Sequence, residues 1–375
     1  MQKIKGTKAE MNILIYDVAA EYAGALTILK KFYNEVIDYE NKTHNWYFVV
    51  SNNEFKEQEN IKVISVPWIK KTWFHRWYYD NFCVKKLIKR YNIDLIFSMQ
   101  NMAIKGVKCP QIVYLHQSLQ FSPIKYSFFK KDERLLWIRQ NIICNLMKQS
   151  LRYANTIVVQ TKWMKAATKD WLKDPKKKIE VIPPDIVIKE NCEHVDKRVP
   201  ELFFYPAADE VYKNHEIIIR ACEILQQKNI PYRVLFTMNT DESRYASKLY
   251  LEVKRKKLNI EFVGLLEYEQ IMRLYKKATL VFPSCLESYG LPLLEAKKSD
   301  GLILCSDLPF AHEILDDYEN AYFFNTMDEK QLADYMEKCS IGLIIPHKNV
   351  NTHTTKDIQE NKSLVEYILE QERKC

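Results

Sequence analysis

The sequence predicts an α/β protein of two domains, each built on a parallel sheet covered by helices. The chain has 375 residues, which is more than one hydrophobic core usually serves. Short runs rich in β-branched and aromatic residues alternate with amphipathic stretches, the pattern of strands that alternate with helices. This alternation occurs in two cycles, and a proline-containing polar segment separates them.

The first cycle occupies residues 11–188, which we assign to an N-terminal domain. Its strands are expected near residues 12–16, 46–50, 62–66, 94–98, 111–115, 156–159 and 180–182. Its helices are expected near residues 25–39, 81–91, 135–153 and 163–171. Parallel strands need a long crossover between them, and a helix after a strand supplies it.

The second cycle occupies residues 199–345 and follows a hinge. Pro183 and Pro184, followed by polar residues up to Pro200, have the composition of a linker. Strands are expected near residues 202–205, 233–236, 261–263, 280–282, 302–305 and 322–324, and helices near 215–227, 245–258, 267–277, 293–298 and 330–337. Residues 346–375 are expected to form a polar loop and a final helix, and periodicity assigns that helix to neither domain.

Charge is divided unevenly along the chain. The net charge is +8, but residues 1–199 hold 34 Lys and Arg against 20 Asp and Glu, whereas residues 200–375 hold 22 against 28. A basic half predicts contact with an anionic surface, either nucleic acid or a membrane face.

Residues 68–77 read WIKKTWFHRW, and basic and aromatic residues gather again over 125–139. This composition suits a membrane interface, and equally a solvated basic face over an aromatic core. No nucleic-acid recognition motif accompanies it, so we expect an anionic membrane surface and no nucleic acid.

Cysteine spacing and hydropathy indicate a cytoplasmic protein. The nine cysteines lie singly, without a C-x-x-C pair or zinc-binding spacing, which favours reduced thiols and no bound metal. No run approaches the roughly 18 apolar residues of a membrane-spanning helix. We therefore expect a cytoplasmic location, on the inner face of the membrane if the basic half binds lipid.

The most informative segment reads PSCLESYGLPLLEA over residues 283–296, directly after an expected strand. Gly290 allows the backbone to turn tightly beside a ligand, and Pro292 suits the first position of a helix. The unpaired amides at a helix start attract anions such as a diphosphate. Glu287 and Glu295 can each accept hydrogen bonds from sugar hydroxyls, although a solvated loop acid and a first-turn acid are the alternatives.

The stretch ESYGLPLLE resembles the E-x7-E signature of retaining glycosyltransferases with the GT-B fold, the group 1 or family 4 class. Further segments resemble this family in the same order, namely YLHQ at 114–117, ANTIVVQT at 154–161, YPA at 205–207 with KNH at 213–215, and FVG at 262–264. The resemblance covers roughly residues 12–324, which makes a chance match of a single motif a poor explanation. It implies two Rossmann-like domains facing a central cleft, of which residues 11–188 would bind the acceptor and residues 199–345 the nucleotide sugar.

The resemblance also implies roles for individual residues. Glu287 and His116 would contact the transferred sugar, and Lys213 would neutralise the leaving diphosphate. Glu295 would hold the donor ribose, and the remaining donor-site residues would be Ser288, Tyr289, Gly290, Leu291, Val263, Gly264, Asn214 and Gly24. The donor would be a UDP- or GDP-sugar, with no resident cofactor and no metal. His116 can instead be a buried structural histidine, and Lys213 a solvated lysine.

One departure from the family concerns the phosphate site. Ala207 and Ala208 stand in the region where the family commonly has an arginine, a few residues before the lysine. The sequence still favours a retaining glycosyltransferase that acts on a saccharide or lipid-linked acceptor, in bacterial surface polysaccharide or lipopolysaccharide biosynthesis. The alternatives are a GT-B-fold nucleotide-sugar epimerase and a non-catalytic relative that only binds sugar nucleotides.

Overall fold

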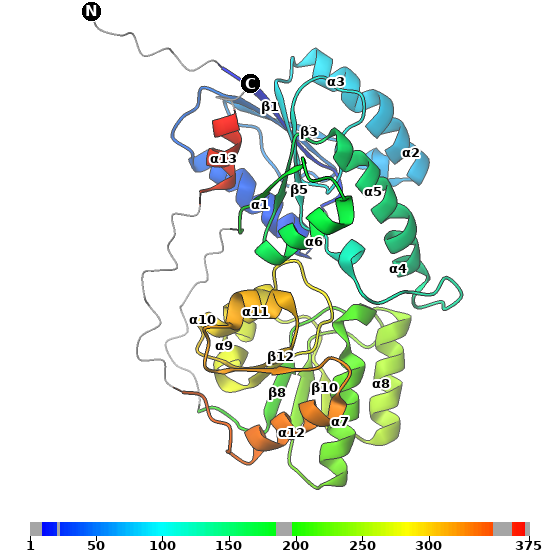
Figure 1. Cartoon of the computed structure of the whole chain (residues 1–375), viewed down its shortest axis with the longest axis vertical. Coiled ribbons are helices and arrows are strands. Elements are labelled where there is room, and N and C mark those ends of the chain that lie inside the picture. The colour runs from blue at the N-terminus through cyan, green and yellow to red at the C-terminus, as the bar shows by residue number, and fades with distance from the viewer. Residues whose placement is uncertain (1–9, 21–22, 185–196, 348–361, 372–375) are drawn as a thin grey trace, which may run out of the picture. The chain divides into compact units, whose positions relative to one another are not determined.

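The computed structural model describes the chain in two compact α/β units. Residues 10–20, 23–184, 197–347 and 362–371 are described. The first unit lies within Met1–Gln117, Asn141–Asp185 and Gln359–Cys375, and the second within Ser118–Gln140 and Ile186–Ile358. Each unit holds one parallel sheet with helices against it (Figure 1). The predicted α/β fold class is therefore confirmed.

The first unit is built on a seven-stranded parallel sheet in the order β3-β2-β1-β4-β5-β6-β7. The strands are β1 (Asn12–Asp17), β2 (Asn45–Val50), β3 (Ile61–Ser65), β4 (Leu95–Ser98), β5 (Gln111–Leu115), β6 (Thr156–Val159) and β7 (Lys178–Val181). The central strands are buried along their whole length, because helices cover both faces of a parallel sheet. Their continuous apolar runs are the reason that the sequence predicts them well.

The helices of the first unit depart from expectation in two places. They are α1 (Ala23–Asp38), η1 (Pro67–Lys70), α2 (Trp73–Tyr78), the π-helical turn η2 (Tyr79–Cys83), α3 (Val84–Arg90), α5 (Cys144–Ser150), η5 (Leu151–Tyr153) and α6 (Lys162–Leu172), with a second π-helical turn, η4 (Arg139–Ile143), at the border of the units. The sequence starts the second helix at residue 81 and misses α2, since that helix buries none of its six residues and shows no apolar periodicity. Gly24, which the resemblance assigns to the donor site, is the second residue of α1, so this helix begins two residues before the expected start at residue 25.

The last helix, α13 (Leu364–Gln371), packs on the first unit beside α1 (Figure 1). Val365 and Ile368 belong to the same buried apolar cluster as the core residues of α1 and β1. The backbone N–H of Val365 also donates to the Glu35 carboxylate at 3.0 Å. The end of the chain thus completes the core of the unit that its beginning forms.

The second unit is built on a six-stranded parallel sheet in the order β10-β9-β8-β11-β12-β13. The strands are β8 (Leu202–Tyr205), β9 (Arg233–Phe236), β10 (Ile260–Phe262), β11 (Thr279–Phe282), β12 (Leu302–Ser306) and β13 (Ala321–Phe324). The helices are η3 (Leu119–Phe121), α4 (Arg134–Ile138), η6 (Val211–Lys213), α7 (His215–Gln227), α8 (Arg244–Lys256), α9 (Tyr268–Lys277), α10 (Leu291–Lys298), α11 (Pro309–Leu315) and α12 (Glu329–Ser340). The sequence predicts neither α4 as a separate element nor the short α11.

Strand order places a switch point in each sheet. In the first sheet, β2 lies on one side of β1 and β4 lies on the other. The loops after β1 and β4 therefore lead away from each other at the carboxyl edge. In the second, the loops after β8 and β11 do the same. Open parallel sheets bind ligands in the crevice at such points. In the second unit, Lys213 and Glu287 lie on these two loops, whereas Val263 and Gly264 follow β10.

Candidate active site

The loops after β8 and β11 bring together two residues that lie far apart in the sequence. Lys213 ends the short helix η6, and Glu287 lies in the loop between β11 and α10. The Lys213 Nζ and the Glu287 Oε1 are 2.6 Å apart, and both side chains are largely buried. A short, poorly solvated ion pair of this kind is strongly oriented, because each group has lost most of its water.

Hydrogen bonds fasten the two loops to each other beneath this pair. The Cys285 N–H donates to the Tyr212 carbonyl at 2.8 Å, and the Tyr205 hydroxyl donates to the Lys213 carbonyl at 2.9 Å. The Asn214 side chain donates to the Thr326 carbonyl at 3.0 Å, while its backbone adopts the left-handed conformation at φ 58°. The Asn214 side chain therefore links the loop after β8 to the loop after β13, and its 3.4 Å bond to the Pro283 carbonyl reaches the loop after β11.

The helix start predicted near Pro292 is present. Gly290 precedes α10 in the left-handed conformation at φ 84°, and Leu293 donates its N–H to the Gly290 carbonyl at 2.9 Å. The Leu291 N–H, at the first helical position, has no partner within the helix and is open to an anion, whereas Pro292 has no N–H. Pro292 occupies the second helical position, one residue later than expected. Ser288 and Tyr289 lie half-buried on the loop that enters the helix.

Glu295 is held by a residue that the sequence does not single out. The Tyr275 hydroxyl, from α9, donates to the Glu295 Oε2 at 2.9 Å. Burial raises the pKa of Glu295, and the bond from Tyr275 opposes that rise because it stabilises the carboxylate. Tyr275 is itself buried against Phe204, with 5.2 Å between the ring centroids. One carboxylate oxygen is thus fixed, which leaves the other to a ligand.

Val263 and Gly264 extend the sheet beyond β10 at the same carboxyl edge. The Val263 N–H donates to the Phe236 carbonyl at 3.0 Å, and the Gly264 N–H to the Met238 carbonyl at 3.3 Å. Gly264 has φ 72°, and a Cβ placed there would lie 2.7 Å from the Asn239 Oδ1. Only glycine fits this position without a shift of its neighbours. Leu265, directly after it, is almost fully exposed.

His116 lies in the first unit, directly after β5. The Asn101 Oδ1 accepts the backbone N–H groups of His116 at 2.8 Å and Gln117 at 3.0 Å, which orients the Asn101 amide. Its Nδ2 therefore faces the His116 Nε2, 3.2 Å away, as a donor. Burial lowers the pKa of His116 to about 4, so the ring is neutral near pH 7 and carries its proton on Nδ1. The His116 Nδ1 is buried and has no hydrogen-bond partner among the described residues.

A polar cluster at the switch point of the first unit was not predicted. The Asp17 Oδ1 accepts the N–H groups of Ala19 at 3.1 Å and Ala20 at 3.0 Å, and burial raises its pKa to about 6 against these two bonds. In the same cluster, Arg76 of α2 donates to the Asp80 Oδ2 at 2.8 Å and the Gln100 Oε1 at 2.5 Å. An acidic residue at the end of a buried strand, as Asp17 is, is the signal that could have revealed this edge.

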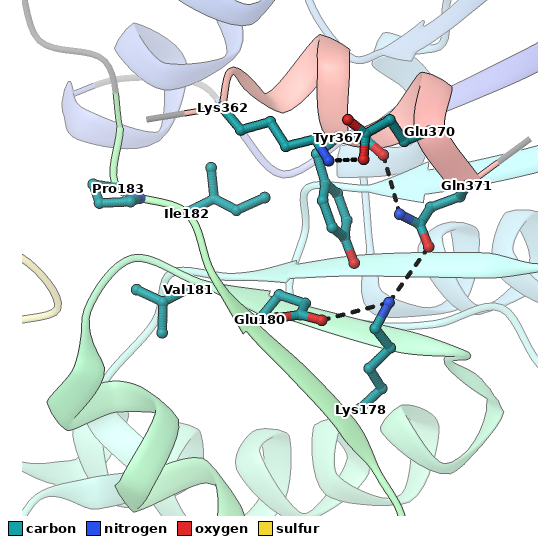
Figure 2. A pocket seen from close by; sticks show the side chains of 9 residues that line it. All are labelled: Lys178, Glu180, Val181, Ile182, Pro183, Lys362, Tyr367, Glu370 and Gln371. Carbon is teal, nitrogen blue, oxygen red and sulfur yellow. Dashed lines mark hydrogen bonds and ion pairs between the residues drawn. The ribbon is translucent and has the colours of Figure 1, made fainter. Parts of the chain in front are cut away.

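Two other features lie apart from these residues. A pocket of about 290 Å³ in the first unit is lined by residues of β7 and α13, and its charged groups pair with one another, as Lys178 does with Glu180 and Lys362 with Glu370 (Figure 2). In the described ranges, no group of three His, Cys, Asp or Glu side chains is placed to hold a metal ion. None of the described helices is both long enough and apolar enough to cross a bilayer.

Comparison with known families matches almost the whole of this architecture. The model of the family described as glycosyl transferases group 1 matches residues 190–341, and that of glycosyltransferase family 4 matches residues 40–188. Each half of the chain thus matches the family domain that the resemblance implied for it.

Individual relatives agree with the family assignment. The O-antigen chain mannosyltransferase RfbU of Salmonella typhimurium is 37% identical over 81 residues, which span 21% of this chain and 22% of RfbU. Among solved structures, the lipopolysaccharide glycosyltransferase WaaG has a TM-score of 0.64 at 13% identity, over 88% of this chain and 90% of WaaG. HepE of Anabaena, solved with UDP and glucose, has a TM-score of 0.60 at 16% identity, over 88% and 89%. At these identities the two structures bear on the fold, which is the two-domain GT-B architecture.

Proposed function

This chain belongs to the glycosyltransferases of group 1 and family 4, and we propose that it transfers a sugar from a UDP- or GDP-sugar to a saccharide or lipid-linked acceptor with retention of configuration. The observation that carries the proposal is the Lys213–Glu287 pair at the switch point beside the start of α10. A cation, a carboxylate and the N-terminal end of a helix in one place suit a diphosphate joined to a sugar.

The Lys213–Glu287 ion pair is the state of the site without a sugar nucleotide, and a bound sugar nucleotide would separate the two side chains. A diphosphate at the start of α10 would draw the Lys213 ammonium away from Glu287, because it offers more negative charge than a carboxylate. Glu287 would then accept hydrogen bonds from the hydroxyls of the transferred sugar. Lys213 and the helix amides would stabilise the charge that develops on the leaving diphosphate, the task that a metal ion performs in other enzymes. We therefore propose that the reaction needs no metal.

Lys213 must neutralise the diphosphate alone, whereas the family commonly places an arginine beside the lysine for this task. Ala207, in the loop after β8, is buried and offers no charge. We therefore expect Lys213 to contribute more to catalysis than the lysine does in a site that also holds the arginine. The partial match to an O-antigen mannosyltransferase supports an acceptor in bacterial surface polysaccharide or lipopolysaccharide biosynthesis, with the reaction on the cytoplasmic side.

A two-step experiment tests this function. Thermal-shift measurements across UDP-, GDP- and ADP-sugars identify the donor, since a ligand that binds only the native state raises the melting temperature. Incubation with the labelled donor then distinguishes the outcomes: label on a saccharide or lipid supports transfer, conversion of the donor alone indicates an epimerase, and binding without reaction indicates a non-catalytic relative.

Variants of Lys213 test the site itself. Lys213→Ala should lower kcat by about 10²- to 10³-fold, a loss typical of a removed transition-state charge partner. Lys297→Ala is the matched control, because Lys297 lies on α10 but binds the Ile314 carbonyl at 2.8 Å, away from the pair. Equal losses in both variants, or a Lys213→Ala variant of unchanged kcat, would contradict the assignment.

A further inference from the structure

The helix formed by α2, the π-helical turn η2 and α3 carries an aromatic ridge on its outer face. Trp73, Phe74 and Trp77 are 73%, 67% and 53% exposed, although such large rings are usually among the more buried residues. Tyr78 and Phe82 continue the ridge and are also exposed. Contiguous exposed aromatics of this kind mark a surface that meets a partner.

The π-helical turn keeps these rings in one cluster. Ring centroids lie 5.8 Å apart for Phe74 and Trp77, 5.7 Å for Trp77 and Phe82, and 5.5 Å for Tyr78 and Phe82. Trp77 and Phe82 are five residues apart, a spacing that would separate them around a regular α-helix. The wider π-helical turn over Tyr79–Cys83 returns Phe82 to the face of Trp77. The opposite face, with Tyr79, Val84 and Ile88, is buried.

Basic residues flank the ridge at both ends. Lys70 and Lys71 precede α2, and Lys85, Lys86 and Lys89 follow Phe82 by three, four and seven residues, on the same face of the helix. The one acid between residues 67 and 90 is Asp80, and Arg76 and Tyr16 already hold it. The outer face is therefore aromatic in the middle and positive at its ends.

From this pattern we propose that the α2–α3 face binds the surface of an anionic phospholipid bilayer, with the aromatic ridge in the interface and the lysines against the head groups. Aromatic rings favour the boundary between head groups and acyl chains, and lysines gain from the negative surface potential. A second copy of this chain fits less well, because pairing these faces would bring two positive rims together. Residues 118–140, the other basic and aromatic stretch, group with the second unit.

The buried side of the same helix connects the proposed membrane contact to the edge of the first sheet where the acceptor is expected. Arg76 reaches Gln100, directly beyond β4, and Asp80 accepts a hydrogen bond from Tyr16 of β1. The helix that meets the bilayer is therefore anchored at the carboxyl edge of the first sheet, where we expect the acceptor. This use rests on the proposed function, whereas the binding itself does not and is measured without donor.

Co-sedimentation of the full chain with vesicles tests the surface. Vesicles with equal parts of phosphatidylcholine and phosphatidylglycerol should bind the protein, vesicles of pure phosphatidylcholine should bind it weakly, and salt should reduce the binding. The variant Trp73→Ser/Phe74→Ser/Trp77→Ser should bind the anionic vesicles at least about tenfold more weakly. Its donor-induced thermal shift should stay unchanged, which separates loss of this surface from loss of the donor site.

A control variant removes an equal amount of exposed apolar surface elsewhere. Leu251→Ser/Met327→Ser/Leu343→Ser alters three residues of the second unit that are 66%, 79% and 71% exposed, and it should bind vesicles as the unaltered protein does. No vesicle binding by the unaltered protein, equal losses in both variants, or a concentration-dependent dimer that only the Trp73 variant abolishes would each overturn the proposal.

Discussion

At the scale of single residues, the site depends on contacts that hold its charged groups in place. Tyr275 illustrates this, because its hydroxyl fixes one oxygen of Glu295 at 2.9 Å while its ring packs against Phe204. Glu295 is also partly buried, and burial raises its pKa. A carboxylate in such surroundings needs a hydrogen-bond donor, here the Tyr275 hydroxyl, to remain both charged and oriented.

Tyr275→Phe should therefore weaken donor binding while the fold persists. The ring stays and the hydroxyl goes, so the free energy lost is that of one hydrogen bond to a charged group, about 1.5–3 kcal/mol, or roughly ten- to a hundredfold in Kd. Calorimetric titration with the preferred donor measures it. Tyr318→Phe is the control, because it removes a buried hydroxyl that donates to the Gly301 carbonyl at 2.7 Å. Equal affinities for the Tyr275 variant and the unaltered protein would show that Tyr275 does not position Glu295.

His215 links the same site to pH. It is fully buried at the start of α7, and neither ring nitrogen has a partner among the described residues. Burial and the nearby Lys213 lower its pKa to about 3. Between the ordinary value near 6.5 and pH 3, the unfolded chain binds a proton here that the native state does not, so acidification destabilises the protein.

His215→Phe should remove this part of the acid sensitivity. Phenylalanine suits the aromatic surroundings, where the His215 ring centroid lies 4.7 Å from Tyr205 and 5.0 Å from Phe236. The loss in unfolding free energy between pH 7 and pH 5 should shrink by about 2 kcal/mol, measured by urea denaturation at both values. His347→Phe, at an exposed position, should leave it unchanged. If the variant loses as much unfolding free energy between pH 7 and pH 5 as the unaltered protein does, the His215 ring of the unaltered protein is protonated in its native state.

At the scale of elements, the start of α10 depends on a single left-handed residue. A Cβ on Gly290 would lie 3.3 Å from the Ile314 Cδ1, and φ is 84°. Gly342 has a similar φ of 76°, but nothing lies within 4 Å of a Cβ there. The two glycines therefore share the conformational cost of a side chain and differ in its surroundings.

Gly290→Ala should cost about 1–2 kcal/mol of stability and weaken donor binding, since the backbone that opens α10 must move. Gly342→Ala should cost about 1 kcal/mol and leave donor binding intact. Chemical denaturation and the donor-induced thermal shift give both quantities. A Gly290 variant with a normal thermal shift would exclude the start of α10 as the diphosphate site.

The elements also show what sequence reasoning can reach. The strands of both sheets were predictable because helices bury both of their faces, which gives each a short apolar run. The juxtaposition of Lys213 and Glu287 followed from the motif and from the carboxyl-edge rule for parallel sheets. The helix α2 was missed because its aromatic residues face outward, and an exposed apolar face breaks the pattern on which helix prediction rests.

Contacts between distant elements left no signal in the sequence. Tyr275 reads as one apolar position of an amphipathic helix, and only the packing of α9 against α10 reveals that its hydroxyl meets Glu295. Asn101 likewise reads as a loop residue, although it orients His116 through two backbone bonds and its amide. Residues that position a catalytic group act through tertiary geometry, and a single sequence does not encode that geometry locally.

At the scale of the whole molecule, the chain crosses between its two units more than once. It starts in the first unit, builds the second, and returns through α13 to the core around α1. Ile368 is fully buried there, whereas Lys213 and Glu295, proposed to hold the diphosphate and the ribose of the donor, lie in the second unit. A change at Ile368 and a bound donor should therefore stabilise or destabilise different parts of the molecule.

Calorimetric unfolding of Ile368→Ala tests this division. Truncation of a buried isoleucine should cost the first unit about 2–4 kcal/mol and lower the melting temperature of its transition by several degrees. The preferred donor should mainly raise the other transition, because the residues proposed to hold its diphosphate and ribose belong to the second unit. In the variant with donor present, the two transitions should thus move apart. A single transition that the mutation lowers and the donor raises by matching amounts would show instead that the two units unfold as one cooperative body, so that α13 contributes to the stability of the donor site.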